Sequence, residues 1–496
     1  MHEVAVGRSP WVDYVSEERV SQMGTSLMPS LPDEIVMQGI LPSPISSYSG
    51  SLVWPYAQQL VTECLRRNPD TRPSSDQLKQ VFSNIQSCAL KMIHSLHKPF
   101  VSCTVTTGSS RSNNLYDDNL LEIFYVETTP PSGKSSSTIH RNTINIDRGK
   151  VLSEKVETEF STNVISMVVV PGHMVGLESK PIFVGATKKG EILVCSNDSV
   201  IKKKSLKHAI TCLMLHQPYQ GKMGSPVFLL VGTAEASVVV YSIKQFLNPK
   251  DPHPLHELNL AQLTKLSPVS SIVSSRNEIV FVACANQVVS LAVSASGQPT
   301  IQATKVVGHM NSIEISYLAL GRNNLYAATL GGSIVYWPLG GGMSKTSFNF
   351  KKVVSQMVDC DPAIMIVTSL FVDKLRASLW VGTSTGHVIV FAEPLRPDDI
   401  IIPTCVLHRH TGSVYNIQIY KNPLDDCDVI ICCGTGIRPI AEDWENHRNK
   451  KSEIKSTGNF NADVIHNTTS YVTIWVPEVL ELTQCLKNAI KRRNDL

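Results

Sequence analysis

Residues Leu379–Phe391 have the sequence LWVGTSTGHVIVF, in which two apolar runs enclose a short polar turn. The first run ends in Gly382, the small and polar residues Thr383–Gly386 follow, and a β-branched run begins at Val388. Apolar runs rich in β-branched residues on both sides of a turn of Gly, Ser and Thr indicate a β-hairpin. The stretch therefore predicts two adjacent antiparallel strands.

This hairpin pattern occurs six times from about residue 160 onward, and a small residue ends the first run each time. The small residues are Gly185, Gly232, Ala283, Ala328, Gly382 and Gly434. Positions 185, 232, 283, 328, 382 and 434 are separated by steps of 47, 51, 45, 54 and 52 residues. A four-stranded propeller blade needs roughly 40 to 50 residues. The spacing therefore predicts a β-propeller, in which Gly185, Gly232, Gly382 and Gly434 mark blade turns.

Further strand-like runs complete the predicted ring. One such run precedes each hairpin, as at Ile210–Met214, and supplies an inner strand. A seventh blade can be assembled from Phe100–Val105 and Leu120–Val126. We therefore expect a mainly β, seven-bladed ring over residues 100–477, which leaves no long sheet edge exposed. Residues 437–470 interrupt the last hairpin and form either a binding loop or a tolerated insertion.

The bulk composition disfavours several function classes. The 45 basic and 42 acidic residues leave a formal net charge of +3, which is too small for phosphate-backbone binding to be the main purpose. The 12 cysteines follow no repeating spacing, which favours a reducing compartment and hence the cytoplasm. Because we find no apolar leader and no apolar run of about 18 residues, we expect neither secretion nor a membrane span.

Before the repeats, the periodicity changes to that of α-helices. Apolar residues at helical spacing predict a helix over Ala57–Leu65, which stops at Asn68-Pro69. A second helix is expected to be capped by Ser74 or Ser75 and to carry apolar residues on one face as far as Ile85. A small helical region is thus predicted ahead of the ring.

Part of this helical region resembles a protein kinase. The run Cys64–Pro73, CLRRNPDTRP, resembles the pattern that closes a kinase C-lobe. With Asp33–Pro44 and Trp54-Pro55, it is similar to the end of the kinase domain in leucine-rich repeat kinases of the Roco family. The resemblance implies that Trp54, Arg72 and Pro73 are structural residues of a kinase tail.

The repeats resemble the WD40 propeller at the C-terminus of the same family. Gly308-His309 and His410–Val414 resemble the His-containing turn before an inner strand, while Trp337 and Trp475 stand where the Trp of a WD dipeptide falls. The dipeptide itself does not occur in the sequence. A degenerate WD40 ring is therefore expected.

The resemblance extends over residues 33–496 and implies a domain order. We expect a disordered, unassigned segment over 1–32, a kinase C-lobe remnant over 33–95, the WD40-like propeller over 100–477 with its insertion at 437–470, and a C-terminal helix over 478–496. In the family this last helix runs back along the kinase domain. It is therefore expected to dock against helices near residues 55–95.

The catalytic motifs of a kinase do not accompany this resemblance. A kinase needs a Gly-rich loop, a phosphate-binding Lys, an HRD Asp, a DFG Asp for Mg²⁺ and an APE segment, and residues 1–100 contain none of them. In the family, the Arg at the position of Arg72 pairs with the APE Glu, so a remnant lacking that Glu is expected to be poorly stable and to indicate a truncated transcript or gene model. The chain is expected to be non-catalytic and without a cofactor, with ATP and Mg²⁺ needed only by the parent kinase.

Three other patterns have both a functional and a structural interpretation. Gly382–Gly386 matches the G-x-S-x-G nucleophile elbow, but a strand follows where the elbow needs a helix, so a hairpin turn is favoured. The Cys and His residues between Cys405 and Cys433 lack the spacing of a zinc site, so a structural role is favoured and no metal is expected. Lys202–Lys204, with Lys207 and His208, could bind an acidic partner or lipid, but a solvated turn is favoured.

Two functions remain, and a third is disfavoured. The favoured hypothesis is a scaffold whose rims bind proteins, and the resemblance implies self-association and contacts with cytoskeletal or vesicle proteins. The alternative is a fragment of an ATP-dependent serine/threonine kinase with a GTPase domain, whose catalytic residues lie upstream of Met1. Nucleic-acid binding is disfavoured because a basic excess and stacking motifs are lacking. We expect a cytoplasmic protein, and peripheral association with membranes remains open.

Overall fold

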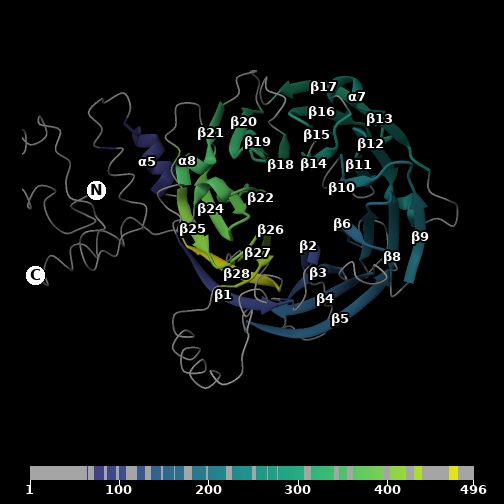
Figure 1. Cartoon of the computed structure of the whole chain (residues 1–496), viewed down its shortest axis with the longest axis horizontal. Coiled ribbons are helices and arrows are strands. Elements are labelled where there is room, and N and C mark those ends of the chain that lie inside the picture. Colours follow the sequence, from purple (N-terminus) through teal and green to yellow (C-terminus); the bar gives the residue numbers. More distant parts are fainter. Residues whose placement is uncertain are drawn as a thin grey trace, which may run out of the picture.

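The structure is a computed structural model that describes residues 64, 72–82, 87–96, 100–107, 120–128, 136–146, 149–160, 162–171, 181–196, 199–218, 226–247, 253–264, 266–275, 278–306, 314–339, 346–354, 361–393, 395, 401, 403–420, 429–437 and 469–478. These residues form seven four-stranded antiparallel sheets, arranged as blades around a central axis (Figure 1). The predicted mainly β, seven-bladed propeller is confirmed.

Six blades consist of four consecutive strands, which follow one another from the innermost strand outward. Blade 1 contains β2 (Phe100–Thr107), β3 (Leu120–Thr128), β4 (Ser137–Asn145) and β5 (Lys150–Phe160). Blade 2 contains β6 (Val164–Val170), β7 (Ile182–Thr187), β8 (Glu191–Ser196) and β9 (Ser199–Ser205). Blade 3 contains β10 (Ile210–His216), β11 (Phe228–Thr233), β12 (Ser237–Ser242) and β13 (His256–Asn259).

The next three blades repeat this order. Blade 4 contains β14 (Val269–Ser274), β15 (Ile279–Cys284), β16 (Gln287–Val293) and β17 (Pro299–Val306). Blade 5 contains β18 (Ile315–Leu320), β19 (Asn324–Thr329), β20 (Ser333–Pro338) and β21 (Thr346–Asn349). Blade 6 contains β22 (Val367–Asp373), β23 (Ser378–Thr383), β24 (His387–Ala392) and β25 (Pro403–His408).

Blade 7 closes the ring by joining the two ends of the described chain. Its inner three strands are β26 (Val414–Tyr420), β27 (Val429–Thr435) and β28 (Ser470–Glu478), and its outermost strand is β1 (Ser87–Ser95). Strand β1 pairs antiparallel with β28, with Ser95 opposite Tyr471. The ring therefore begins at Ser87 rather than at residue 100, and it takes up part of the range assigned to the kinase remnant. Propensity alone could not show this, because β1 is a strand only through its pairing with β28.

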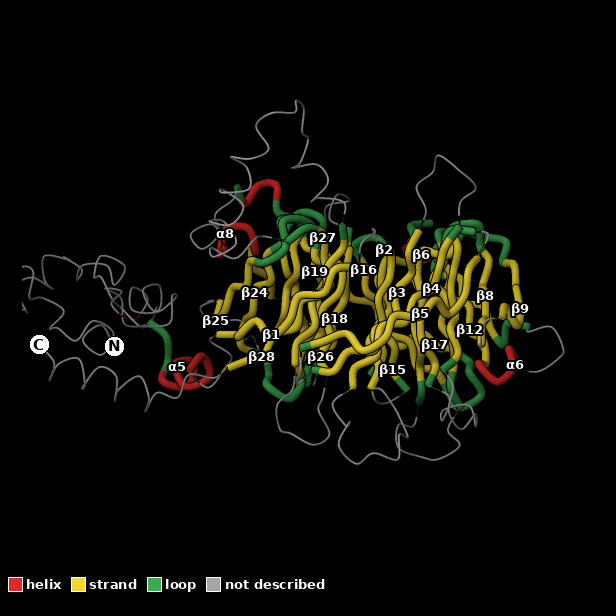
Figure 2. Tube along the Cα trace, turned by 90° about the horizontal axis from the view of Figure 1, so that it is seen from below, coloured by secondary structure: helices red, strands yellow, loops and turns green. Residues whose placement is uncertain are grey.

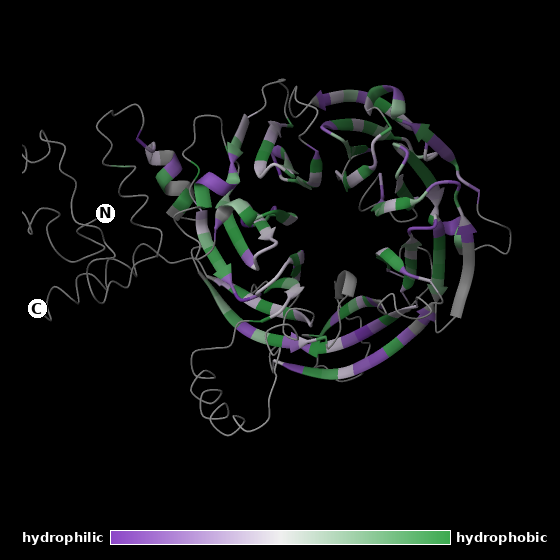
Figure 3. Cartoon of the chain, in the orientation of Figure 1, coloured by the Kyte–Doolittle hydropathy of each residue, from purple (hydrophilic) through white to green (hydrophobic). Residues whose placement is uncertain are grey.

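The strands inside each blade are buried on both faces because neighbouring blades pack against them. Every residue of β7, β11, β19 and β23 is buried, whereas the outermost strands β13 and β21 alternate between half-buried and exposed residues. Figure 3 shows the same contrast, with apolar strands inside the blades and more polar ones on the outer circumference. One apolar cluster joins Trp380 of blade 6 to Ile417 and Ile430 of blade 7. Blade-to-blade packing thus supplies the core.

Each innermost strand carries a β-bulge near its first residue. In blade 6, for example, Val367 pairs with Thr383 and Ser369 pairs with Gly382, which leaves Thr368 as the extra residue. The same shift occurs at the start of β2, β6, β10, β14, β18 and β26. Thr368 Oγ1 donates to Val414 O of the next blade at 2.7 Å. The bulge therefore turns a side-chain hydroxyl toward the neighbouring blade.

The described helices are short. Helix α5 (Ser75–Phe82) precedes the ring, and Ser74 caps it: Ser74 N donates to Gln77 Oε1 at 2.9 Å, and Gln77 N donates to Ser74 Oγ at 3.2 Å. The expected second helix thus forms with Ser74 as its cap. The other helical segments, α6 (Ile243–Leu247), α7 (Ala261–Thr264), α8 (Phe350–Val354) and η6 (Pro362–Ile364), lie in connections of the ring.

Several expected segments lie outside the described residues. They are the segment 1–32, Trp54, the first predicted helix apart from Cys64, His309, most of the 437–470 insertion, and the C-terminal helix after Glu478. The described strands place that insertion between β27 and β28, which pair with each other. None of the helices in the described part of the chain is long and apolar enough to cross a membrane.

Candidate interaction surface on the upper rim

The ring has two rims, at which the chain turns between strands. We call the rim at which each innermost strand begins the upper rim, and the opposite one the lower rim. The upper rim holds the loops between blades and the turns between second and third strands; α8 lies there, and α6 lies on the lower rim (Figure 2). Loops on a rigid scaffold commonly carry binding residues. Both rims are therefore candidate surfaces.

The upper rim carries five of the large apolar side chains that are exposed among the described residues. They are Leu263, Leu266, Leu330, Ile364 and Ile366. The lower rim has three, Ile279, Leu339 and Leu375. Single exposed apolar residues are normal, whereas apolar residues that gather on one surface favour an interaction site there. The upper rim is thus the better candidate for binding another protein.

On blades 5 and 6, hydrogen bonds connect the upper-rim segments. Phe350 N donates to Gly332 O at 3.0 Å, and Lys351 Nζ donates to Ala363 O at 2.7 Å. Ile366 N donates to Ser384 Oγ at 3.0 Å. The exposed residues Leu330, Ile364 and Ile366 therefore stand on segments that are fixed to one another.

Two exposed tyrosines stand near the starts of the innermost strands β18 and β26. Tyr317 and Tyr415 are both more than a third exposed. Partial burial of the Tyr317 phenol raises its pKa, and the nearby Tyr415 raises that pKa further. The Tyr317 phenol is therefore neutral at physiological pH. Both tyrosines present aromatic surface with a hydroxyl, a combination that is common in protein interfaces.

The His-containing turn before β26 forms a buried chain of hydrogen bonds. Trp475 Nε1 donates to Thr473 Oγ1 at 2.9 Å, and Thr473 Oγ1 lies 3.1 Å from His410 Nε2. His410 Nδ1 lies 3.3 Å from Gly436 O. Burial lowers the pKa of His410 to about 4. A neutral ring that carries its proton on Nδ1 can donate to Gly436 O and accept from Thr473 Oγ1, a hydroxyl that also lies 3.3 Å from Cys432 O. His410 and Trp475 thus hold blade 7 together, as their WD40-like positions suggest.

The four glycines expected at blade turns lie within strands. Gly185, Gly232, Gly382 and Gly434 are residues of β7, β11, β23 and β27. A Cβ on Gly232 would lie 2.6 Å from Cys212 Sγ and 2.7 Å from Val269 Cγ1 of the next blade. The turns between second and third strands instead contain Gly190, Gly332 and Gly386, with φ of 80°, 84° and 83°. The small residues recur because neighbouring strands approach closely, not because a turn needs them.

The G-x-S-x-G stretch is a hairpin turn. Strand β23 ends at Thr383 and β24 begins at His387, so a strand follows where a nucleophile elbow needs a helix. Besides accepting from Ile366 N, Ser384 Oγ donates to Ile364 O at 3.3 Å. The hydroxyl is thus engaged with the backbone of the preceding loop.

The Cys and His residues near blade 7 do not converge on a metal. Among the residues that the structure describes, no group of three or more His, Cys, Asp or Glu side chains could hold a metal ion, and Cys427 lies outside them. Cys432 is buried, and burial raises the pKa of its thiol well above the ordinary value. Such a thiol packs as a small apolar group and is a poor ligand in its protonated form.

The basic cluster lies on a sheet edge rather than in a turn. Lys202–Lys204 belong to β9, the outermost strand of blade 2, and Lys207 follows in the loop to blade 3. His208 Nδ1 lies 2.9 Å from Glu235 Oε1. The expected solvated turn is therefore incorrect for Lys202–Lys204, because β9 pairs with β8 and lysines suit an exposed edge.

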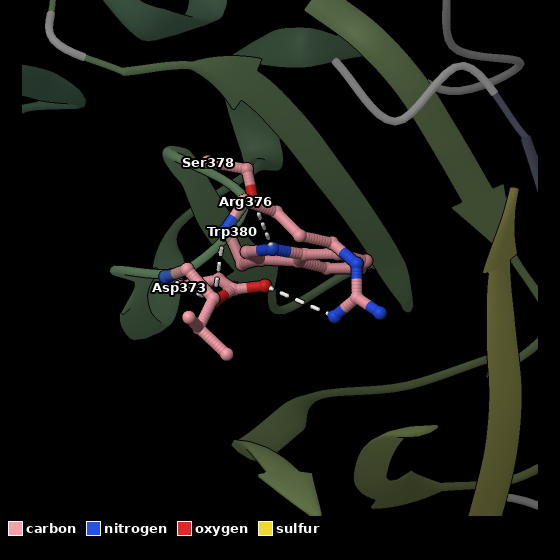
Figure 4. A network of polar contacts seen from close by, with 5 residues as sticks. Asp373, Arg376, Ser378 and Trp380 are labelled. Atoms are coloured by element: carbon pink, nitrogen blue, oxygen red, sulfur yellow. Dashed lines mark hydrogen bonds and ion pairs between the residues drawn. The ribbon is translucent and has the colours of Figure 1, made fainter. Parts of the chain in front are cut away.

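The lower rim is held by local polar contacts. Asp373, at the end of β22, accepts from Leu375 N at 2.9 Å and pairs with Arg376 Nη1 at 3.3 Å (Figure 4). Trp380 Nε1 donates to Ser378 Oγ at 2.8 Å in the same blade. These contacts fix the turn between β22 and β23.

Of the kinase-tail residues, Arg72 and Pro73 precede α5, and Arg72 is exposed.

Seven four-stranded blades with a His-containing turn define a WD40-like β-propeller protein. A family model described as the LRRK2 beta propeller matches residues 131–455, more than half of the chain. The chain belongs to this LRRK2 β-propeller family. A similar solved structure is the crystal structure of RRP9 WD40 repeats, with a TM-score of 0.49 and 12% identity, covering 78% of this chain and 100% of that chain. The described ring extends beyond the family match, from Ser87 to Glu478.

Proposed function

We propose that this chain is a non-catalytic protein-interaction scaffold of a leucine-rich repeat kinase-like signalling protein. The main support is the set of exposed apolar residues on the upper rim of blades 5 and 6. Leu330, Ile364 and Ile366 stand on segments joined by hydrogen bonds, so the backbone that carries these side chains is fixed before a partner arrives. A preformed surface loses little conformational entropy on binding.

The partners proposed are proteins, including a second copy of the chain and cytoskeletal or vesicle proteins. Tyr317 and Tyr415 supply aromatic groups close to the same rim. Aromatic residues are enriched among the few interface residues that contribute most of the binding free energy. We propose a cytoplasmic location for this binding.

A comparison of three forms of the full chain tests the scaffold. The first is wild type, the second carries Leu330→Ser, Ile364→Ser and Ile366→Ser, and the third carries Leu339→Ser and Leu375→Ser on the lower rim. Analytical ultracentrifugation and affinity capture should show self-association or bound partners for the first and third forms, and a loss of at least tenfold for the second. A wild-type chain that stays monomeric and captures nothing would reject the scaffold.

The alternative proposal, a fragment of an active kinase, depends on the resemblance of residues 33–73. The transcript upstream of the Met1 codon should then encode the HRD and DFG motifs. The chain itself should not bind ATP under either proposal, so sequencing separates them better than an ATP-binding assay.

A further inference from the structure

Blades 2, 3 and 4 share a continuous stretch of upper rim that differs from the apolar stretch of blades 5 and 6. It comprises the turn 188–190, the loop 206–209, the turn 234–236, and residues 260–264 and 266–268 of the next loop, and we call it the lysine–leucine rim. Its backbone bonds are Leu206 N to Gly190 O at 2.7 Å, Ala234 N to Ala209 O at 2.9 Å, and Leu260 N to Ala236 O at 2.7 Å. The four segments are therefore fixed to one another.

Three lysines project from one end of the lysine–leucine rim. Lys188 and Lys189 occupy the turn between β7 and β8, Lys207 lies in the neighbouring loop, and all three are exposed. None of them forms an ion pair with another residue that the structure describes. Gly190 anchors the turn, since its φ is 80° and a Cβ there would lie 2.5 Å from His208 O. The ammonium groups thus stand on a fixed backbone.

Two leucines project from the other end. Leu263 belongs to α7, and Leu266 follows it with 66% of its surface exposed, the largest exposed fraction among the large apolar residues described. Leu266 also has a φ of 53°, a left-handed conformation that costs a non-glycine residue energy and is often retained for function. A strained and fully projecting leucine contributes little to the core of the ring.

One carboxylate lies on these segments, and a histidine contacts it. Glu235 lies in the turn 234–236, between the lysines and the leucines, and its Oε1 is 2.9 Å from His208 Nδ1. The three lysines outnumber this carboxylate, so these segments carry an excess of positive charge next to the exposed leucines. This is the composition of peripheral proteins that lie on anionic bilayers, with lysines at the headgroups and leucines at the acyl boundary.

We propose that the lysine–leucine rim is a membrane-binding edge for bilayers that contain anionic lipids. A bilayer fits better than an acidic peptide because Leu263 and Leu266 are exposed on the same rim as the lysines and offer apolar side chains that a lipid surface can bury. Each lysine near an anionic bilayer surface increases the partition coefficient of the protein from water to the membrane roughly fivefold. Three lysines and two leucines together suffice for reversible, salt-sensitive attachment.

The test uses the full chain and two kinds of vesicle, one of phosphatidylcholine alone and one of phosphatidylcholine with phosphatidylserine. In co-sedimentation, the wild-type chain should bind only the vesicles with phosphatidylserine, and added salt should weaken the binding. The double variant Lys188→Glu, Lys189→Glu should bind at least roughly thirtyfold more weakly. Leu266→Asn removes the apolar side chain but introduces a residue that tolerates the left-handed conformation. This variant should bind the vesicles about tenfold more weakly than wild type at low salt.

Matched controls lie on the lower rim. Lys150→Glu reverses the charge of another exposed lysine, and Leu339→Ser removes another exposed leucine, so both should bind vesicles as wild type does. Thermal unfolding of every variant checks that the ring stays folded, and Lys207→Glu provides an independent charge reversal. No binding to phosphatidylserine vesicles, or equal binding by Lys188→Glu, Lys189→Glu and wild type, would overturn the proposal. Binding of a polyglutamate peptide without vesicle binding would instead assign the rim to an acidic protein.

Discussion

Thr473 Oγ1 lies 3.1 Å from His410 Nε2, and this contact joins the loop between blades 6 and 7 to the third strand of blade 7. Trp475 Nε1 donates to the same hydroxyl at 2.9 Å. One threonine hydroxyl thus connects two groups that lie far apart in the sequence. Since all three side chains are buried, a polar atom that loses one of these contacts has little access to water as a replacement partner.

Replacing Thr473 by Val should destabilise the ring. The variant keeps the shape of the side chain but leaves the indole N–H of Trp475 and one nitrogen of His410 buried without a partner, at a cost of about 1–3 kcal/mol. Urea denaturation followed by tryptophan fluorescence measures the effect. Thr304→Val, at an exposed position of β17, should change the unfolding free energy by less than about 0.5 kcal/mol. Equal losses of unfolding free energy in both variants would show that the hydrogen bonds of Thr473 make no particular contribution to stability.

Arg141 should stabilise blade 1 by neutralising two buried carboxylates. It contacts Glu122 Oε1, and its Nη1 lies 3.6 Å from Glu157 Oε1. Arg141→Met leaves both carboxylates in the sheet without that cation, at a cost of about 3 kcal/mol, the lower end of the range for broken buried pairs because Arg141 is itself partly exposed. Denaturant midpoints measure the loss. Adding Glu122→Gln to the variant should recover part of it, and no recovery would contradict this interpretation.

Glu393 should make the stability of the ring depend on pH. Its side chain is buried, and burial raises the pKa of this carboxyl, an effect that the neighbouring Asn323 backbone and Tyr326 hydroxyl offset only in part. A raised pKa means that the folded state binds the proton more tightly, so stability is greatest below the ordinary pKa and falls as pH rises through the raised one.

Glu393→Gln should therefore be more stable than wild type at neutral pH and equal to it at acidic pH. Thermal unfolding over a series of pH values measures the difference. Glu159→Gln, at an exposed position of β5, should run parallel to wild type at every pH. A Glu393→Gln curve that also stays parallel to wild type would contradict the expected linkage.

Gly232 should tolerate no side chain. Gly232→Ala places a Cβ within 2.7 Å of atoms of Cys212 and Val269, and overpacking of this kind costs about 1–3 kcal/mol. Gly331→Ala is the matched control, because its Cβ would meet nothing closer than 3.9 Å from Thr329 Oγ1. Gly232→Ala should have a lower melting temperature than Gly331→Ala. Similar melting temperatures would mean that the neighbouring blade shifts to accommodate the added methyl group without loss of stability.

Strand β1 should be needed for a stable ring. A fragment over residues 97–478 lacks the outermost strand of blade 7 and leaves the edge of β28 without its partner, whereas a fragment over 85–478 keeps it. The shorter fragment should melt at a lower temperature and aggregate through the open edge. Equal melting temperatures and equal solubility for the two fragments would show that six complete blades hold the seventh without closure.

Much of the ring was predictable from local pattern. Hairpins such as Leu379–Phe391 repeat at the spacing of propeller blades, and within a blade every strand except β1 pairs with a neighbour in sequence, so the number and order of the blades follow from the repeat. The cap at Ser74 was also predictable, because capping depends on residues only three apart. Local interactions determine these features.

Other features required the tertiary structure, because they depend on residues far apart in the chain. Ser87–Ser95 becomes a strand only beside Ser470–Glu478, and Gly232 is small because Val269 of the next blade approaches it. The lysine–leucine rim likewise brings Lys188 and Leu266 onto one connected surface through backbone bonds between loops. The sequence by itself determined a seven-bladed ring, since the repeat carries that information. Closure, close contacts between blades and the surfaces of the rims were decided by tertiary packing.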